Sequence, residues 1–159
     1  MDVRNNTFNP NFTSVIVPKA SQRRFMIALR EECTTDNLLR CLQTIEKEKK
    51  NPNNIVISDV GYFWGQPCCG HLCATVNGDV FYNSDCFLTF PTPAKFLDKM
   101  SKKAAKFLSK DEKVARKSQD IHNKAEIIEK QQLRQKGLVS EDEQRNYFLG
   151  EIYKAINMK

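Results

Sequence analysis

The sequence predicts an α+β fold, in which a small antiparallel β-sheet with a Cys/His-rich hairpin is flanked by N-terminal helices and followed by a helical C-terminal half. Three observations lead to this prediction. Asn77-Gly78 joins two short apolar runs, the strongest local signal for a β-hairpin. Residues 22–50 carry apolar side chains at helical spacing. Residues 93–157 combine helix-start signals with a high density of charge.

The 159 residues suffice for one domain with an extension. Residues 1–14 are polar and rich in Asn, and we expect a flexible arm there. We expect an α+β domain with the Cys/His node over residues 15–109, and a helical extension over residues 110–159 that packs on the domain or on a second copy. No run approaches the ~20 apolar residues of a membrane span, and the first residues lack the features of a signal peptide. The sequence therefore favours a cytoplasmic or nuclear location.

The N-terminal elements are predicted from cap and apolar signals. Residues 15–17 precede Pro18 and are expected to form a short edge strand. Ser21 is the predicted N-cap of a helix over about 22–32. A second helix is expected over about 36–50. Its predicted core face is a row of apolar side chains: Leu38, Leu39, Cys41, Leu42 and Ile45.

The sheet is predicted from three further runs. Strands are expected over residues 55–64, 72–76 and 79–81, and Asn77-Gly78 joins the last two. A two-residue turn at Asn77-Gly78 fixes the register, because the numbers of paired residues must then sum to 155. Three aromatic residues of this region are predicted to belong to the core: Trp64, Phe81 and Phe87.

The segment from Cys68 to Cys73 is rich in metal-binding side chains. It contains three of the six cysteines and one of the two histidines. Thiolate and neutral imidazole are ligands that zinc prefers. The hairpin register pairs Cys73 with Tyr82 and lays four Cys and His side chains on one face. These four are the predicted ligands of a structural Zn²⁺, with Cys68 as a substitute for Cys69: Cys69, His71, Cys73 and Cys86.

Two other interpretations of this node stay open. The thiols can be small buried residues beside an ordinary polar His, or one of them can be a reactive thiol. Cys-Gly-His-x-Cys resembles the middle of a RING finger, but the two Cys-x2-Cys pairs of that family are missing, so its ligase activity is not expected. Cys33 and Cys41 are interpreted as helix-face residues, and His122 as a solvated side chain.

The net charge of +6 lies in the second part of the chain. Residues 1–90 hold nine Lys/Arg and nine Asp/Glu, whereas residues 91–159 hold sixteen and ten. Helices are predicted over about 93–109 and 110–136, with a break near Ser109, and they carry a row of lysines at a spacing of three or four. A localised excess of this kind indicates a binding face. The candidate nucleic-acid contacts are these lysines: Lys95, Lys99, Lys102, Lys103, Lys106, Lys110, Lys113 and Lys117.

The C-terminal half also carries apolar residues. A sparse seam repeats every seven residues, and it can pair with a second copy or fold back on the last helix: Val114, Ile121 and Ile128. Gly137 is the predicted C-cap of the preceding helix. Ser140 to Glu143 is a capping box that begins the last helix, which ends near residue 157. The predicted apolar stripe of that helix is Tyr147, Phe148, Ile152 and Ile156.

These features together predict a zinc-stabilised, non-enzymatic protein that binds nucleic acid in an accessory or regulatory role. Lysine predominates over arginine in the row, which favours contact with phosphates over reading of bases. The combination of a Cys-rich node and a basic flank is similar to the loose class of small viral regulators and silencing suppressors.

Other partners stay open. In the alternative interpretation, the chain is a protein–protein interaction or assembly protein that acts through its C-terminal helices, and the cysteines are merely buried. Such a protein can form a homo-oligomer. The lysine row can also be a solvated face, or a contact for an acidic protein partner or an acidic membrane surface. The sequence has no phosphate-binding loop, zinc-protease motif or paired-carboxylate motif, and we expect no enzymatic activity.

Overall fold

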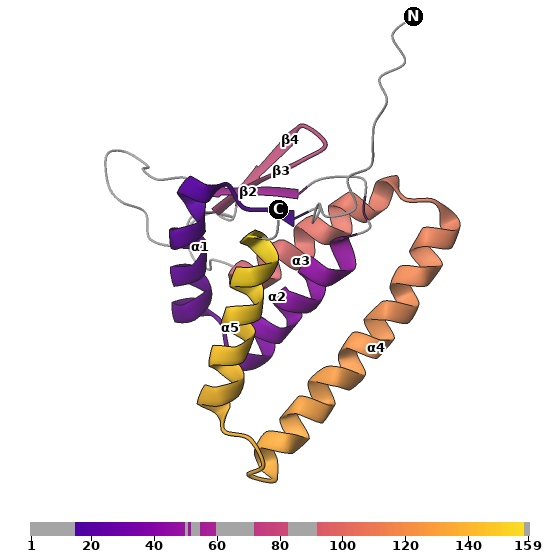
Figure 1. Cartoon of the computed structure of the whole chain (residues 1–159). Coiled ribbons are helices and arrows are strands. Elements are labelled where there is room, and N and C mark those ends of the chain that lie inside the picture. Colours follow the sequence, from indigo (N-terminus) through magenta and orange to yellow (C-terminus); the bar gives the residue numbers. More distant parts are fainter. Residues whose placement is uncertain (1–14, 50, 52–54, 60–71, 83–91, 158–159) are drawn as a thin grey trace, which may run out of the picture.

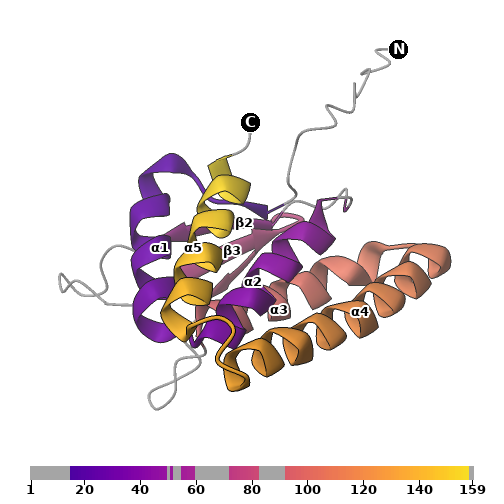
Figure 2. The ribbon, with the colours of Figure 1, turned by 60° about the horizontal axis from the view of Figure 1, so that its bottom comes forward.

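A computed structural model of the chain describes residues 15–49, 51, 55–59, 72–82 and 92–157. In these ranges the helices gather on one side of a small sheet (Figures 1 and 2). This arrangement confirms the α+β class. The elements follow the chain in this order: β1 (Val15–Ile16), α1 (Lys19–Glu32), α2 (Thr35–Glu48), β2 (Ile55–Asp59), β3 (Leu72–Val76), β4 (Asp79–Tyr82), α3 (Pro93–Ala104), the 3₁₀ turn η1 (Ala105–Phe107), α4 (Lys110–Gln135) and α5 (Glu141–Asn157).

The four strands are ordered β1-β2-β3-β4, and the sheet is mixed. β2, β3 and β4 are antiparallel neighbours, but β1 runs parallel to β2. The prediction of a purely antiparallel sheet is therefore wrong at this edge. β1 and β2 are joined by α1 and α2, and a long helical connection can bring the chain back in the same direction, which a tight turn cannot. The expected edge position of β1 is confirmed.

The hairpin of β3 and β4 has the predicted register. Cys73 pairs with Tyr82 and Val76 pairs with Asp79. Asn77 and Gly78 both have positive φ, 51° and 86°, as a two-residue turn that matches the twist of the strands requires. The other predicted zinc ligands, Cys68, Cys69, His71 and Cys86, lie outside the residues that the structure describes, as do Trp64 and Phe87.

The core lies between the sheet and the helices. Alternate residues of β3 are buried, and the residues between them are only half-buried. Phe25 and Leu29 of α1 are fully buried, as are Leu38 and Ile45 of α2. Leu42 and Phe81 are partly buried and pack against this core. Burying a side chain of this size contributes about 1.5–3 kcal/mol each, so this layer supplies most of the driving force for folding.

The start of α1 differs from the prediction. The helix begins at Lys19, with Pro18 at the N-cap position, and Ser21 is a buried residue of the first turn. The carbonyl oxygen of Pro18 accepts hydrogen bonds from the backbone N–H groups of Ser21 (2.7 Å) and Gln22 (3.1 Å). The backbone itself satisfies these donors, so no side-chain cap is needed.

Other helix boundaries are set by capping residues. Thr92 accepts a hydrogen bond from the backbone N–H of Lys95, and Pro93 occupies the first turn of α3. Ser109 and Glu112 form a capping box that begins α4, so the predicted break near Ser109 is confirmed. Gly137 has φ 68° directly after α4.

The end of α4 is closed by backbone hydrogen bonds. The N–H of Leu138 donates to the carbonyl of Leu133 (3.1 Å), and the N–H of Gly137 donates to that of Arg134 (3.0 Å). This pair of bonds defines a Schellman motif, which favours glycine at the position with positive φ.

The last two helices lie on either side of α2. Both α4 and α5 contact α2, and α5 also contacts α1 (Figure 1). Phe148, Ile152 and Ile156 of α5 are buried as predicted, whereas Tyr147 is 62% exposed and does not belong to the stripe. Each helix within the described residues is too short or too polar to cross a bilayer.

Candidate anion-binding groove

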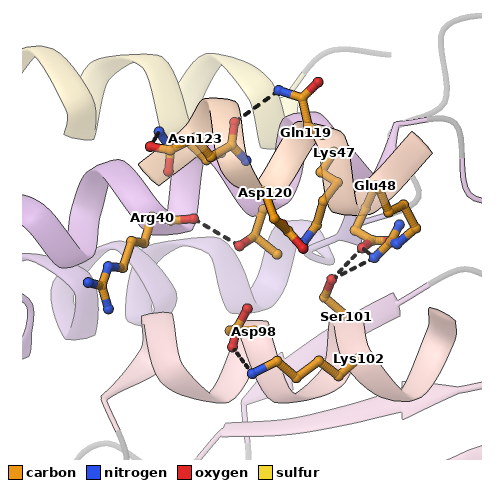
Figure 3. Close-up of polar contacts among 12 residues, drawn as sticks. Arg40, Lys47, Glu48, Asp98, Ser101, Lys102, Gln119, Asp120 and Asn123 are labelled. Carbon is orange, nitrogen blue, oxygen red and sulfur yellow. Dashed lines mark hydrogen bonds and ion pairs between the residues drawn. The ribbon is translucent and has the colours of Figure 1, made fainter. Parts of the chain in front are cut away.

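Figure 1 shows how α2, α3 and α4 are arranged, and Figure 3 shows side chains that they contribute. A groove lies between α3 and α4, with α2 as its floor. It arises at the break predicted near Ser109. There the extended backbone of Leu108 ends one helix, and the capping box at Ser109 begins the next. Both helices then pack against α2, and the space between them has a volume of about 680 Å³.

Positive charge dominates the lining of this groove. Nine Lys and Arg residues line it, against two carboxylates, Asp98 and Asp120. The cations come from α2, from the α3–η1 segment and from α4: Arg40, Lys47, Lys95, Lys102, Lys106, Lys113, Arg116, Lys117 and Lys124. A concave surface lined by one sign of charge concentrates counter-ions, so the groove favours anions.

Both carboxylates of the lining are already paired. Lys47 Nζ lies 2.9 Å from Asp120 Oδ1, and Lys102 Nζ lies 2.9 Å from Asp98 Oδ2 (Figure 3). The hydrogen bond from Lys102 to Asp98, with the charge of that carboxylate, raises the pKa of Lys102, and the carboxylate of Asp120 adds to the effect. Asp120 lies on α4 and Lys102 on α3, so the two walls are within electrostatic reach of each other.

Six groove cations therefore remain for a ligand. Arg116 is paired with Glu48. The other six make no ion pair with the carboxylates of the described residues: Arg40, Lys95, Lys106, Lys113, Lys117 and Lys124. Lys113 Nζ instead donates a hydrogen bond to the carbonyl oxygen of Lys106 (3.5 Å), at the corner where the walls meet.

A buried polar network joins the three helices at one end of the groove. Glu48 of α2 and Ser101 of α3 are fully buried. The carboxylate of Glu48 accepts short hydrogen bonds from Ser101 Oγ and from Arg116 Nη2 of α4 (Figure 3). Asn51 Nδ2 donates to its other oxygen at 2.6 Å. A buried carboxylate needs partners of this kind, and Arg116 is committed to this pairing.

The other end of α4 is held by Asp36 at the start of α2. Arg134 Nη2 and Gln131 Nε2 donate to the two oxygens of this carboxylate, at 2.5 and 2.7 Å. Burial raises the pKa of Asp36, but the hydrogen bonds from Arg134 and Gln131 and the nearby positive charges outweigh it, and the pKa lies below its usual range. The charged carboxylate is thus the form that stabilises this contact.

Between these ends the contact of α4 with α2 is also polar. Gln43 Nε2 donates to the carbonyl oxygen of Asn123 (3.0 Å) and to Glu126 Oε2 (2.8 Å). Ile127 is the one buried residue of α4. The helix is therefore attached mostly by polar and charged contacts, and its opposite face carries an exposed apolar row: Val114 (66%), Ile121 (71%) and Ile128 (54%).

The structure divides the predicted lysine row among α3, η1 and α4. Five of its members line the groove: Lys95, Lys102, Lys106, Lys113 and Lys117. Lys99, Lys103 and Lys110 do not line it. Lys103 instead places its ammonium group 4.1 Å from the ring centroid of Phe81, a cation–π contact.

Sequence reasoning missed Arg40 and Lys47 of α2 and Lys124 of α4. A weak signal existed, because Arg40, Thr44 and Lys47 follow helical spacing on the side of α2 away from its apolar row. That spacing does not reveal which other segment faces it.

The cysteines of the described residues lie in two settings. Cys41 is fully buried and Cys33 nearly so, and burial raises the pKa of both thiols. Cys41 lies on the buried face of α2 as interpreted, whereas Cys33 is the extended C-cap residue that follows α1 and is not on a helix face. Cys73 is half-buried on β3, on the side of the sheet opposite the core. His122 is exposed on α4, as expected.

Comparison with protein-family models, curated proteins and solved structures finds no match to the chain.

Proposed function

We propose that this protein is a non-enzymatic, zinc-stabilised accessory or regulatory protein that binds nucleic acid through the groove between α3 and α4. The observation that carries the proposal is the lining of the groove, with nine cations against two carboxylates. Six of these cations pair with no carboxylate of the residues that the structure describes. A dense array of lysines suits the regularly spaced phosphates of a polyanion, and each neutralised phosphate releases counter-ions.

The zinc part of the proposal is supported by the sequence and by the register of the hairpin. Cys73 pairs with Tyr82, as the prediction of the ligand set requires. Structural zinc stabilises small sheets whose own core is limited. The proposed ligands are Cys69, His71, Cys73 and Cys86, with Cys68 as the substitute for Cys69.

Two double variants with the same change of charge test the groove. Lys106→Glu with Lys117→Glu reverses two cations of the lining, whereas Lys99→Glu with Lys110→Glu reverses two exposed lysines outside it. Each exchange lowers the net charge by two, so both variants fall from +6 to +2. Any difference in affinity between the two variants therefore arises from the positions of the exchanged lysines and not from the overall charge.

The measurement is fluorescence anisotropy with labelled oligonucleotides at about 50 and 200 mM salt. We expect binding that weakens steeply with salt, a loss of about tenfold or more in the groove variant, and a small loss in the control variant. Thermal melts check that both remain folded. Wild-type protein that does not bind at the lower salt, or equal losses in both variants, would contradict the proposal.

A second candidate function is favoured by the exposed apolar row on α4. The sequence left open whether this row packs on the last helix, and the structure leaves it exposed while α5 packs on α1 and α2. Exposed apolar side chains in a regular row are typical of contact surfaces. The candidate is an assembly protein acting through its C-terminal helices, which would bind its partner in a salt-tolerant manner.

A further inference from the structure

The width of the groove is limited by the helix that forms its floor. Neighbouring packed helices have axes about 8–10 Å apart. Since α3 and α4 both pack against α2, their own axes are at most about 16–20 Å apart where both touch it. A helix with its side chains is about 10–12 Å across, so the gap between the two walls is at most about 4–10 Å wide.

Among the described residues, two side-chain hydrogen bonds connect the walls and agree with this narrow gap. Arg116 Nη2 of α4 donates to Ser101 Oγ of α3 at 3.0 Å. At the corner, Lys113 of α4 reaches the backbone of Lys106 in η1. A ligand between the walls therefore meets lysines from both sides at once.

The chemistry of the lining suits phosphates and not bases. No lining residue contributed by the described part of the chain is aromatic, and its few apolar members are small or aliphatic: Ala94, Ala105 and Ile127. Proteins that stack single-stranded bases use exposed aromatic rings. A strand in this groove would place its phosphates inward and leave its bases outside, so recognition would depend little on sequence.

We propose that the ligand of the groove is single-stranded nucleic acid, held by its phosphates between α3 and α4. An α-helix fits inside the major groove of a duplex, so a duplex is wider than an α-helix. A duplex therefore cannot enter a gap that is no wider than an α-helix. The flexible backbone of a single strand can follow the gap and contact both lysine walls. This inference rests on the proposed nucleic-acid binding and specifies its substrate class.

Strandedness is tested with labelled 20-mers: oligo(dT), oligo(dC) and a mixed-sequence duplex. Anisotropy titrations use the wild-type protein, the groove variant (K106E/K117E) and the control variant (K99E/K110E). The single strands are expected to bind about tenfold or more tightly than the duplex at the same salt, with similar affinities for the two homopolymers. If four to six phosphates are engaged, the plot of log K against log salt for single strands has a slope of about −3 to −4.

The outcomes separate this inference from the function on which it rests. A duplex that binds as tightly as the single strands would overturn the inference and leave nucleic-acid binding in place. Single-strand affinity that survives in the groove variant but falls in the control variant would place the strand outside the groove and also overturn it. Failure of every probe to bind would overturn the proposed function itself.

Discussion

Glu48 brings a negative charge into the interior beneath a groove that is otherwise positive. Its side chain is fully buried, and its partners come from three segments: Asn51, Ser101 and Arg116. Desolvating a carboxylate is costly, and the partners offset that cost only while all are present. This residue therefore fixes the positions of α3 and α4 on α2 and thereby the shape of the groove.

Arg116→Met should lower the free energy of unfolding by about 3 kcal/mol, because it leaves the carboxylate of Glu48 buried without its cation. Glu48→Gln should lower the free energy of unfolding by less, since the side chain of Arg116 is partly exposed to solvent. The new amide can also still form hydrogen bonds with Ser101 and Asn51. Urea unfolding followed by circular dichroism measures both values.

The double variant Glu48→Met with Arg116→Met serves as the control. It removes both charges together and should recover part of the loss, and with the single variants Glu48→Met and Arg116→Met it completes a cycle that gives the coupling energy of the pair. If Arg116→Met costs less than about 0.5 kcal/mol, the pair does not hold the three helices together.

At the scale of elements, α4 is an amphipathic helix in an unusual orientation. Its polar residues face α2, and its apolar row points away from the body. Ion pairs hold α4 on α2, and Arg116 Nη2 also donates to Ser101 Oγ of α3 at 3.0 Å. The apolar row stays exposed within the described residues, and we propose it as the contact surface of the assembly function.

Ile121→Glu tests that contact. If the row mediates self-association, the wild-type protein sediments as an oligomer and the variant as a monomer, because a charge at the centre of the row disfavours its burial. His122→Glu, at the next and also exposed position, is the matched control and should leave the oligomer intact. Analytical ultracentrifugation at low and high salt measures the outcome. A monomeric wild-type protein at every concentration would rule out this use of α4.

Local sequence signals predicted the helices and strands well where residues close together in the sequence determine the conformation. Asn77-Gly78 gave the correct register because only a two-residue turn with positive φ connects strands so closely. Ser140 and Glu143 gave the start of α5 for a similar reason, since both partners of the capping box lie within one turn. Ser21 misled because Arg24, three residues later, cannot complete a capping box, and the carbonyl of Pro18 accepts the hydrogen bonds of the first turn instead.

The groove could not be predicted because it depends on three segments far apart in the sequence. The spacing of the lysines was visible in the sequence. The prediction continued this row past Ser109, however, and so placed the lysines of two helices on one surface. The break was expected, yet nothing in the sequence specified the direction that α4 takes after it. Arg40 and Lys47 were missed for the same reason, since they lie some sixty residues or more before their α4 neighbours.

At the scale of the whole molecule, the sheet is small for the helices that it supports. β1 has two residues and β4 has four, and the helices of the described residues gather on one face (Figure 2). A four-stranded sheet packed on helices can be stable by itself, but strands this short gain from an added constraint. The proposed zinc ion would supply one, because Cys73 lies on β3, on the sheet face away from the core.

Native mass spectrometry of the untagged protein should show about one zinc ion per chain. Cys86→Ser should abolish the zinc-bound species and lower the free energy of unfolding by several kcal/mol, since the binding energy of a structural metal is part of the folding energy. Cys33→Ala is the matched control: this thiol is buried beside the helices and is no proposed ligand, so the variant should retain its zinc.

Apo protein that stays fully folded in a strong chelator would contradict the zinc proposal. It would leave the groove untouched, because the residues of the groove come from α2, α3, η1 and α4 and include none of the proposed ligands.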